Sequence, residues 1–431
     1  MNIKPLDYLS YIITNNKNSG VVRHHSKAKK LSKILIKPTG KFLSFINDRA
    51  LMALITILVL TNAFIFYYRI YFPVDSDFGP HMLFTRYLIG GHLDQIPLSI
   101  LAHPGLEIFL AGLYYLSFHK VALGTMLAGI LTISQVMTAV VIYIWLGSGV
   151  KRYWDMGRAF IAGTLTFAAP VMLLIFHDKL FYFGYIDLAN YHNPTIIFLR
   201  PFALISFFLG VRAFNGINNS WKMILASSIL VFISALIKPN YLLCILPALM
   251  ILAMWWKIQH KVVDYRYLLF GFLIPSIVIL GIQWWLAYFS PVGNQAGIIF
   301  SPLGVESAFS GNLLPKFLLS VFFPVSILIF DFRKFKDNPD LLLALIGFLV
   351  SSFQVYLLAE NGNRFYDGNF RWGAQVMLFI WFVISAKELL KRVFDENKSN
   401  GGKIALSTIY LTHIAAGIIF YVHCFLSTSY A

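Results

Sequence analysis

Long apolar runs, separated by short polar or basic segments, dominate this chain. A helix needs about 20 apolar residues to cross a bilayer, and runs near that length recur from residue 51 to residue 426. A membrane barrel would instead show short alternating strands. The pattern predicts an all-α polytopic transmembrane bundle of about eleven spans. The predicted spans are 51–71, 121–146, 159–176, 194–214, 223–237, 241–256, 267–288, 314–330, 341–359, 373–386 and 404–426.

The composition supports the same class of protein. The 431 residues are 58% hydrophobic and only 13% charged, about half the charged fraction of soluble domains. The net charge of +16 would suggest nucleic acid in a soluble protein. Here it is better explained by topology, because Lys and Arg collect in cytoplasmic loops. We therefore expect a multi-pass protein of the cell membrane and no nucleic-acid partner.

The basic segments also predict the orientation. Residues 1–49 form a basic N-terminal tail with few acids, which we expect in the cytoplasm against anionic membrane lipid. Residues 50–431 form the transmembrane domain, and residues 74–118 its first exoplasmic loop. The stretch 97–118 is apolar but short. If it crossed the membrane, Lys151, Arg152 and Arg158 would lie outside, so interfacial helices are favoured over a span.

Two acids follow the first predicted span directly. Asp75 and Asp77 would stand within a few residues of the exoplasmic membrane surface, where a carboxylate can take a proton from an attacking hydroxyl. The Asp-Ser-Asp spacing also resembles a weak site for Mg²⁺ or Mn²⁺. On an extended segment the two side chains point to opposite faces, so one alone could reach a reaction centre. Asp75 is favoured, since it is closer to the end of the span. The alternative is that both acids only end the helix and solvate the loop.

Basic residues on the predicted outer face are the second signal. Outer loops are usually poor in Arg and Lys, so those present there are expected to have partners. Arg200, Lys238, Arg364 and Arg371 lie near the outer ends of different predicted spans, and such groups suit phosphate oxygens. A phosphate at a membrane surface suggests a lipid phosphate. The alternative is local pairing, for example of Arg364 with Asp367 or Glu360.

Histidines complete the candidate site. His81, His103 and His192 could orient an acceptor or the carboxylates, although capping or interfacial hydrogen bonds explain each alone. Glu107 follows His103 by one helical turn and is its expected partner. With Asp75 and Asp77 as candidate catalytic residues, the candidate substrate-binding residues are His81, Arg86, His103, Glu107, His192, Arg200, Lys238, Arg364, Asp367 and Arg371.

These motifs resemble the GT-C superfamily of polytopic glycosyltransferases. Its hallmark is an acid or D-x-D-like pair in the first exoplasmic loop, here Asp75-Ser76-Asp77, often with a His-Pro element before an apolar helix, here His103-Pro104-Gly105. The Lys238-Pro239-Asn240 turn resembles parts of such enzymes more loosely. The resemblance implies inverting transfer of a sugar from a polyprenyl-phosphate carrier to an outer-face acceptor, with the first-loop acid as base. Many members carry a soluble domain after the last span; without one, the loops would recognise a glycan or lipid acceptor.

Two other classes compete with this interpretation. A transporter or flippase of a lipid-linked saccharide would place ionisable groups near mid-membrane on broken helices, whereas here they gather at one face. An O-antigen-type polymerase or ligase usually depends on a very long late loop, and the longest candidate here, residues 289–313, is modest.

Overall fold

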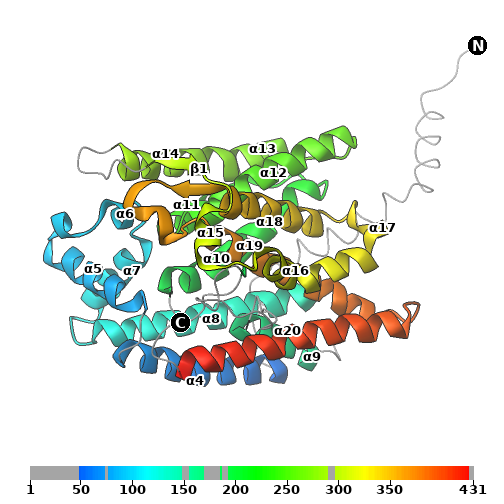
Figure 1. Cartoon of the computed structure of the whole chain (residues 1–431), viewed down its shortest axis with the longest axis horizontal. Helices are drawn as coiled ribbons and strands as arrows, with labels where there is room; N and C mark the ends of the chain where they lie inside the picture. Colours follow the sequence, from blue (N-terminus) through cyan, green and yellow to red (C-terminus); the bar gives the residue numbers. More distant parts are fainter. Residues whose placement is uncertain are drawn as a thin grey trace, which may run out of the picture. The chain divides into compact units, whose positions relative to one another are not determined.

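The computed structural model describes residues 48–72, 76–147, 155–168, 185–186, 193–289 and 297–426 (Figure 1). The predicted tail, apart from its last two residues, lies outside this part of the chain, as do Asp75 and His192. The chain divides after Met52 into two units. In the first, the Asp48 carboxylate accepts from the backbone N–H of Leu51 at 3.1 Å and caps the start of α4. The helix packing and the candidate site lie within the second unit, Ala53–Ala431.

Helices account for almost all of the described residues. They are α4 (Arg49–Tyr71), α5 (Phe78–Gly90), η1 (Leu93–Gln95), α6 (Leu98–Leu101), α7 (Gly105–Leu116), α8 (Leu123–Gly147), α9 (Asp155–Ala168), α10 (Pro194–Val211), η3 (Arg212–Phe214), α11 (Trp221–Ile237), α12 (Asn240–Ile258), α13 (Tyr265–Leu268), the π-helical turn η4 (Leu269–Leu273), α14 (Ile274–Tyr288), α15 (Gly304–Phe309), α16 (Leu313–Phe330), α17 (Phe332–Phe335), α18 (Pro339–Leu357), η5 (Gly362–Asp367), α19 (Arg371–Val393) and α20 (Asn400–Leu426).

Nine helical segments of the described chain are long and apolar enough to cross a bilayer. This confirms a helical, multi-pass membrane protein, and each of the nine coincides with a predicted span. The other two predicted spans are not among these nine segments. Predicted span 223–237 is α11, a 17-residue apolar helix, and span 159–176 runs beyond the described end of α9. In the first loop, α7 has 12 residues, or ~18 Å, which is too short to cross alone.

Helix α19 is the core of the bundle. It packs against α8, α9, α10, α12, α16, α18 and α20, and lies among them in Figure 1. The prediction 373–386 was too short, because the helix extends to Val393 with buried side chains along nearly its whole length. Close packing starts at Gly373, where a Cβ atom would lie 2.6 Å from Cys244 Sγ. A short antiparallel ribbon of β1 (Ile298–Phe300) and β2 (Leu358–Glu360) pairs Ile298 with Glu360 near the start of α19.

Hydrogen bonds among helix ends and the loops beside them define one end of the bundle, which we call the Asp77 end. Helices α4, α11, α14 and α18 end there, and α8, α10, α12 and α19 begin there. The linking contacts are Tyr71 to Thr125 (2.9 Å), Lys238 to Thr195 (3.2 Å), Asn240 to the carbonyl of Asn369 (2.7 Å) and Tyr288 to Glu360 (2.9 Å).

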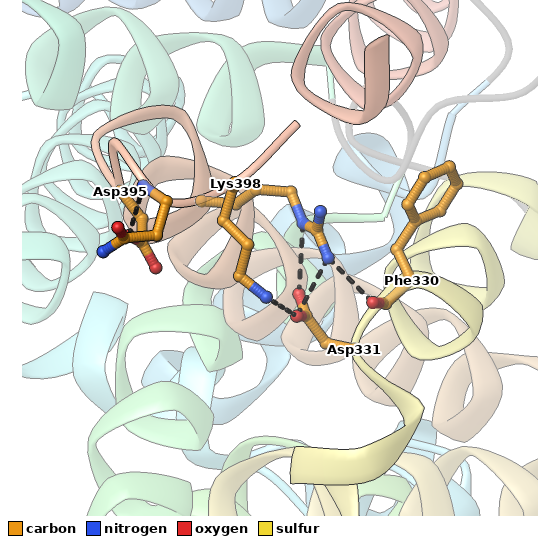
Figure 2. Close-up of polar contacts among 6 residues, drawn as sticks. Phe330, Asp331, Asp395 and Lys398 are labelled. Atoms are coloured by element: carbon orange, nitrogen blue, oxygen red, sulfur yellow. Dashed lines mark hydrogen bonds and ion pairs between the residues drawn. The ribbon is translucent and has the colours of Figure 1, made fainter. Parts of the chain in front are cut away.

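The other end, which we call the Asp331 end, is held by a partly buried ion cluster (Figure 2). Asp331 follows α16 and accepts from Arg392 Nη2 at 3.0 Å and from Lys398 Nζ at 3.2 Å. Arg392 also donates to the carbonyl of Phe330 at 2.7 Å. The cluster therefore ties the ends of α16 and α19 to the start of α20.

Candidate active site

Asp77 stands at the start of α5 and is fixed to the start of α10. Asn193 Nδ2 donates to Asp77 Oδ2 at 2.7 Å, while Asn193 Oδ1 caps α10 by accepting from the backbone N–H of Ile196 at 3.1 Å. The half-buried Asp77 makes no second side-chain hydrogen bond in the described chain, so Oδ1 can accept one from a ligand. Asp75 lies outside the described residues, and its role stays a prediction.

Glu107 pairs with His81, so the expected His103–Glu107 pair was wrong. His81 Nδ1 and Glu107 Oε1 are 2.5 Å apart, and both residues are buried. The helical spacing argument failed because α7 begins only at Gly105, which leaves His103 before the helix. Glu107, in the first turn of α7, instead faces α5, which packs against α7.

Gly105 lets this loop approach the end of α11. A Cβ atom at Gly105 would lie 2.7 Å from the carbonyl carbon and oxygen of Leu236 and 2.8 Å from the nitrogen of Ile237. Backbone atoms cannot move aside as a flexible side chain can, so only glycine fits. The His-Pro-Gly element therefore brings the start of α7 against the turn that carries Lys238.

Lys238 is a buried cation between the first loop and α19. Its Nζ donates to Thr195 Oγ1 at 3.2 Å and lies 4.6 Å from the ring centroid of Trp372. No carboxylate in the described chain is within ion-pair distance of Lys238. Burial lowers its pKa to about 8, against the opposing effects of Asp77 and Glu107. The ammonium is thus held near both acids without being neutralised by direct contact.

His103 is kept neutral beside these groups. Burial lowers its pKa to about 3, and the positive charge of Lys238 adds to the effect, with smaller effects from His81 and Arg364. Its Nδ1 atom is buried without a hydrogen-bond partner. A neutral imidazole here can offer hydrogen bonds to a polar ligand but adds no charge.

The late loop has its own ion pairs, as the local-pairing alternative predicted for Arg364. Arg364 Nη1 lies 3.1 Å from Glu360 Oε1, and Arg364 Nε lies 3.4 Å from Asp367 Oδ2. Glu360 also accepts from Tyr288 at 2.9 Å and from Asn369 at 2.5 Å. Arg364 therefore stabilises the loop through its ion pairs with two carboxylates of the same loop.

Arg371 is paired in the same way. Arg371 Nη2 contacts Glu306 of α15, and both residues are buried. The two pairs line a small pocket. Its lining residues are Val305, Glu306, Val355, Leu358, Ala359, Glu360, Arg364, Phe365, Gly368, Asn369, Phe370 and Arg371.

Arg200 differs from the two late-loop arginines. It is 2% exposed, stacks 4.9 Å over Phe379, and has a buried Nη1 without a hydrogen-bond partner. No carboxylate of the described chain pairs with it. Phe379 follows Trp372 by about two helical turns on the same face of α19 (~10 Å), so Arg200 lies deeper in the bundle than Lys238. Lys238 and Arg200 are therefore the predicted phosphate contacts that keep an available charge.

Some candidates lie apart from this cluster, and some buried charges were missed. Arg86 is exposed, on the other side of α5 from His81, and His192 lies outside the described residues. Sequence reasoning did not select Lys316, which is 0% exposed over the ring of Tyr185, or the buried Arg69. Ionisable residues within apolar runs were the signal that could have found them.

The metal prediction is not settled by the described residues. They contain no group of three or more His, Cys, Asp or Glu side chains arranged for a metal ion. One half of the predicted pair, Asp75, lies outside them, so a Mg²⁺ or Mn²⁺ ion at Asp75 and Asp77 stays a prediction.

Comparisons with known proteins gave no match. No family model matches the chain, and neither the curated proteins nor the solved structures contain a significant match.

Proposed function

We propose that this protein is an integral membrane glycosyltransferase. It would move a sugar from a polyprenyl-phosphate-linked donor to a glycan or lipid acceptor. The observation that supports this is the gathering of Asp77, His81, Glu107 and the unpaired Lys238 at one end of an apolar helical bundle. There, a lipid carrier could lie among helices while its sugar phosphate reaches polar groups. The resemblance of the first loop to GT-C enzymes favours the same reaction.

The proposed reaction needs a base and a cation. The acceptor oxygen attacks the anomeric carbon, the bond from that carbon to the phosphate oxygen breaks, and negative charge grows on the phosphate. Asp77 Oδ1 can accept the hydrogen bond of the acceptor hydroxyl and draw off its proton. Lys238 donates one hydrogen bond, to Thr195, so its other N–H groups can contact the leaving phosphate.

Pairing narrows the choice of phosphate contacts. Arg364 and Arg371 each have a carboxylate partner, and their charge is already largely compensated. Lys238 and Arg200 do not, and an uncompensated buried cation is costly unless a ligand supplies the anion. We therefore assign phosphate binding to Lys238 first, with Arg200 as a deeper contact for the carrier.

We infer that the Asp77 end faces the exoplasm. Lys and Arg collect on the cytoplasmic side of membrane proteins. The helix ends and loops at the Asp331 end carry most of the exposed basic residues of the described chain, such as Lys222, Lys257 and Lys336.

Cysteine labelling tests this orientation. In a variant without Cys244 and Cys424, a cysteine at the exposed Asn363 should react with a membrane-impermeant maleimide on intact cells. A cysteine at the exposed Glu396 should react only after the cells are opened. The reversed pattern would contradict the orientation, and labelling at both positions on intact cells would contradict the bundle topology.

Analysis of a deletion strain tests the function itself. Mass spectrometry of its cell-envelope glycans should find one sugar residue missing, and the wild-type gene should restore it. Unchanged glycans and glycolipids in the deletion strain would reject the proposal. Loss of whole polymers with intact single repeat units would favour the polymerase or ligase, and cytoplasmic build-up of a complete lipid-linked saccharide would favour the flippase.

A further inference from the structure

The His81–Glu107 pair has the geometry of an oriented base. An ionised carboxylate can only accept hydrogen bonds, so His81 Nδ1 is the donor in the 2.5 Å contact. In a neutral ring the second nitrogen, Nε2, then carries the free electron pair. No hydrogen bond to His81 Nε2 is present in the described part of the chain. The carboxylate therefore fixes both the tautomer and the direction of the ring.

The surroundings of Glu107 favour a positive charge on that ring. Glu107 is 2% exposed, and its second oxygen, Oε2, is buried without a hydrogen-bond partner. Lys238 is near enough for Glu107 to raise its pKa, but it makes no ion pair with it. A buried carboxylate with one hydrogen bond is poorly compensated. Adding a proton to His81 would supply the missing charge at contact distance.

His81 is also one turn away from the candidate base. Its backbone N–H donates to the Asp77 carbonyl at 3.2 Å, so the two side chains lie on neighbouring positions of one face of α5. Nε2, with its free electron pair, can therefore receive a proton that is drawn from the acceptor beside Asp77.

We propose that His81 Nε2 is the final holder of the acceptor proton, with Glu107 as its positioning residue. This inference rests on the proposed function and adds a residue role to it. The acceptor O–H bond breaks, and its proton goes to Asp77 and from there to His81 Nε2. The acceptor oxygen bonds to the anomeric carbon, and the electron pair of the broken carbon–oxygen bond stays on the phosphate. The products are the glycoside, the lipid phosphate facing Lys238, and an imidazolium facing Glu107.

Five variants test this role in membranes of the deletion strain, with the transferred sugar measured by mass spectrometry. His81→Gly leaves space for added imidazole. His81→Asn keeps an N–H group near the position of Nδ1, and so keeps the tie to Glu107, but removes the basic nitrogen. Glu107→Gln keeps an acceptor for His81 but removes the charge. The double variant tests whether the two act together. His92→Asn, at an exposed histidine of the same loop, is the matched control.

We expect His81→Asn to lower the transfer rate by at least about 100-fold, the usual contribution of a general base. Glu107→Gln should cost about 10-fold or more, and the double variant should be no slower than His81→Asn, because the two residues act as a unit. His92→Asn should match wild type. Added imidazole should partly restore His81→Gly, which a purely structural tie would not allow.

The outcomes separate the two proposals. If folded His81→Asn keeps more than half of the wild-type rate, the pair is only a tie between α5 and α7, and the inference fails while the proposed function stands. Additive losses, with no rescue by imidazole, would likewise reject the shared proton role. If the wild-type protein itself transfers no sugar, the proposed function fails, and this role fails with it.

Discussion

Asp77→Asn should abolish sugar transfer while the protein remains folded in the membrane. The amide can still accept from Asn193, which now holds Asp77 Oδ2 at 2.7 Å, so the start of α5 should keep its place. It cannot take a proton, and it removes a negative charge that helps Lys238 stay protonated. Both effects act on the reacting groups, so we expect a loss of about 100-fold or more. The loss is measured as the rate of sugar transfer by the variant in membranes of the deletion strain, compared with that of the wild type.

Asp94→Asn is the matched control, because Asp94 is an exposed acid of the same loop. It should keep wild-type activity. Asp75→Asn belongs in the same series, since the sequence favoured Asp75 over Asp77 as the base. Full activity in both single variants and in the double variant would remove the carboxylate from the mechanism.

Lys238→Met should lower transfer by about 100-fold or more, the cost of losing one donor to a developing anion. Methionine is unbranched and only one atom shorter than lysine, so it can still pack on Trp372, which Lys238 now contacts. The protein should therefore fold, and the loss should come from the missing charge. Lys257→Met, at an exposed lysine of the Asp331 end, should be close to wild type.

The pH dependence gives Lys238 a distinct signature. Because burial lowers its pKa to about 8, the ammonium is present below that pH and is lost as the pH rises through it. The wild-type rate should therefore fall on the alkaline side of about pH 8. Lys238→Arg keeps its charge to much higher pH, so any activity that it retains should lack this decline. A wild-type rate that stays flat to pH 9.5, or an unchanged decline in Lys238→Arg, would contradict the assignment.

Local sequence was enough to predict the class of protein and the position of the acids that follow its first span. Whether an apolar run can cross a membrane depends on its own length and composition, so nine predicted spans reappear as helices of the structure. The first-loop acids were placed by the same reasoning, since they follow the first run directly. The end of α19 was missed because its last turns carry charges, such as Lys387 and Arg392, that are buried by packing.

Tertiary structure decided which charges are paired. Glu306 and Arg371 are 65 residues apart and His81 and Glu107 are 26 apart, and no periodicity links positions on different helices. The packing of helix termini at the Asp77 end determines which of these side chains pair. The sequence by itself therefore determined a helical membrane protein with acids and bases near its helix ends. Only the packing of those ends determined that Glu107 pairs with His81. The same packing leaves Lys238 and Arg200 without a carboxylate partner in the described chain.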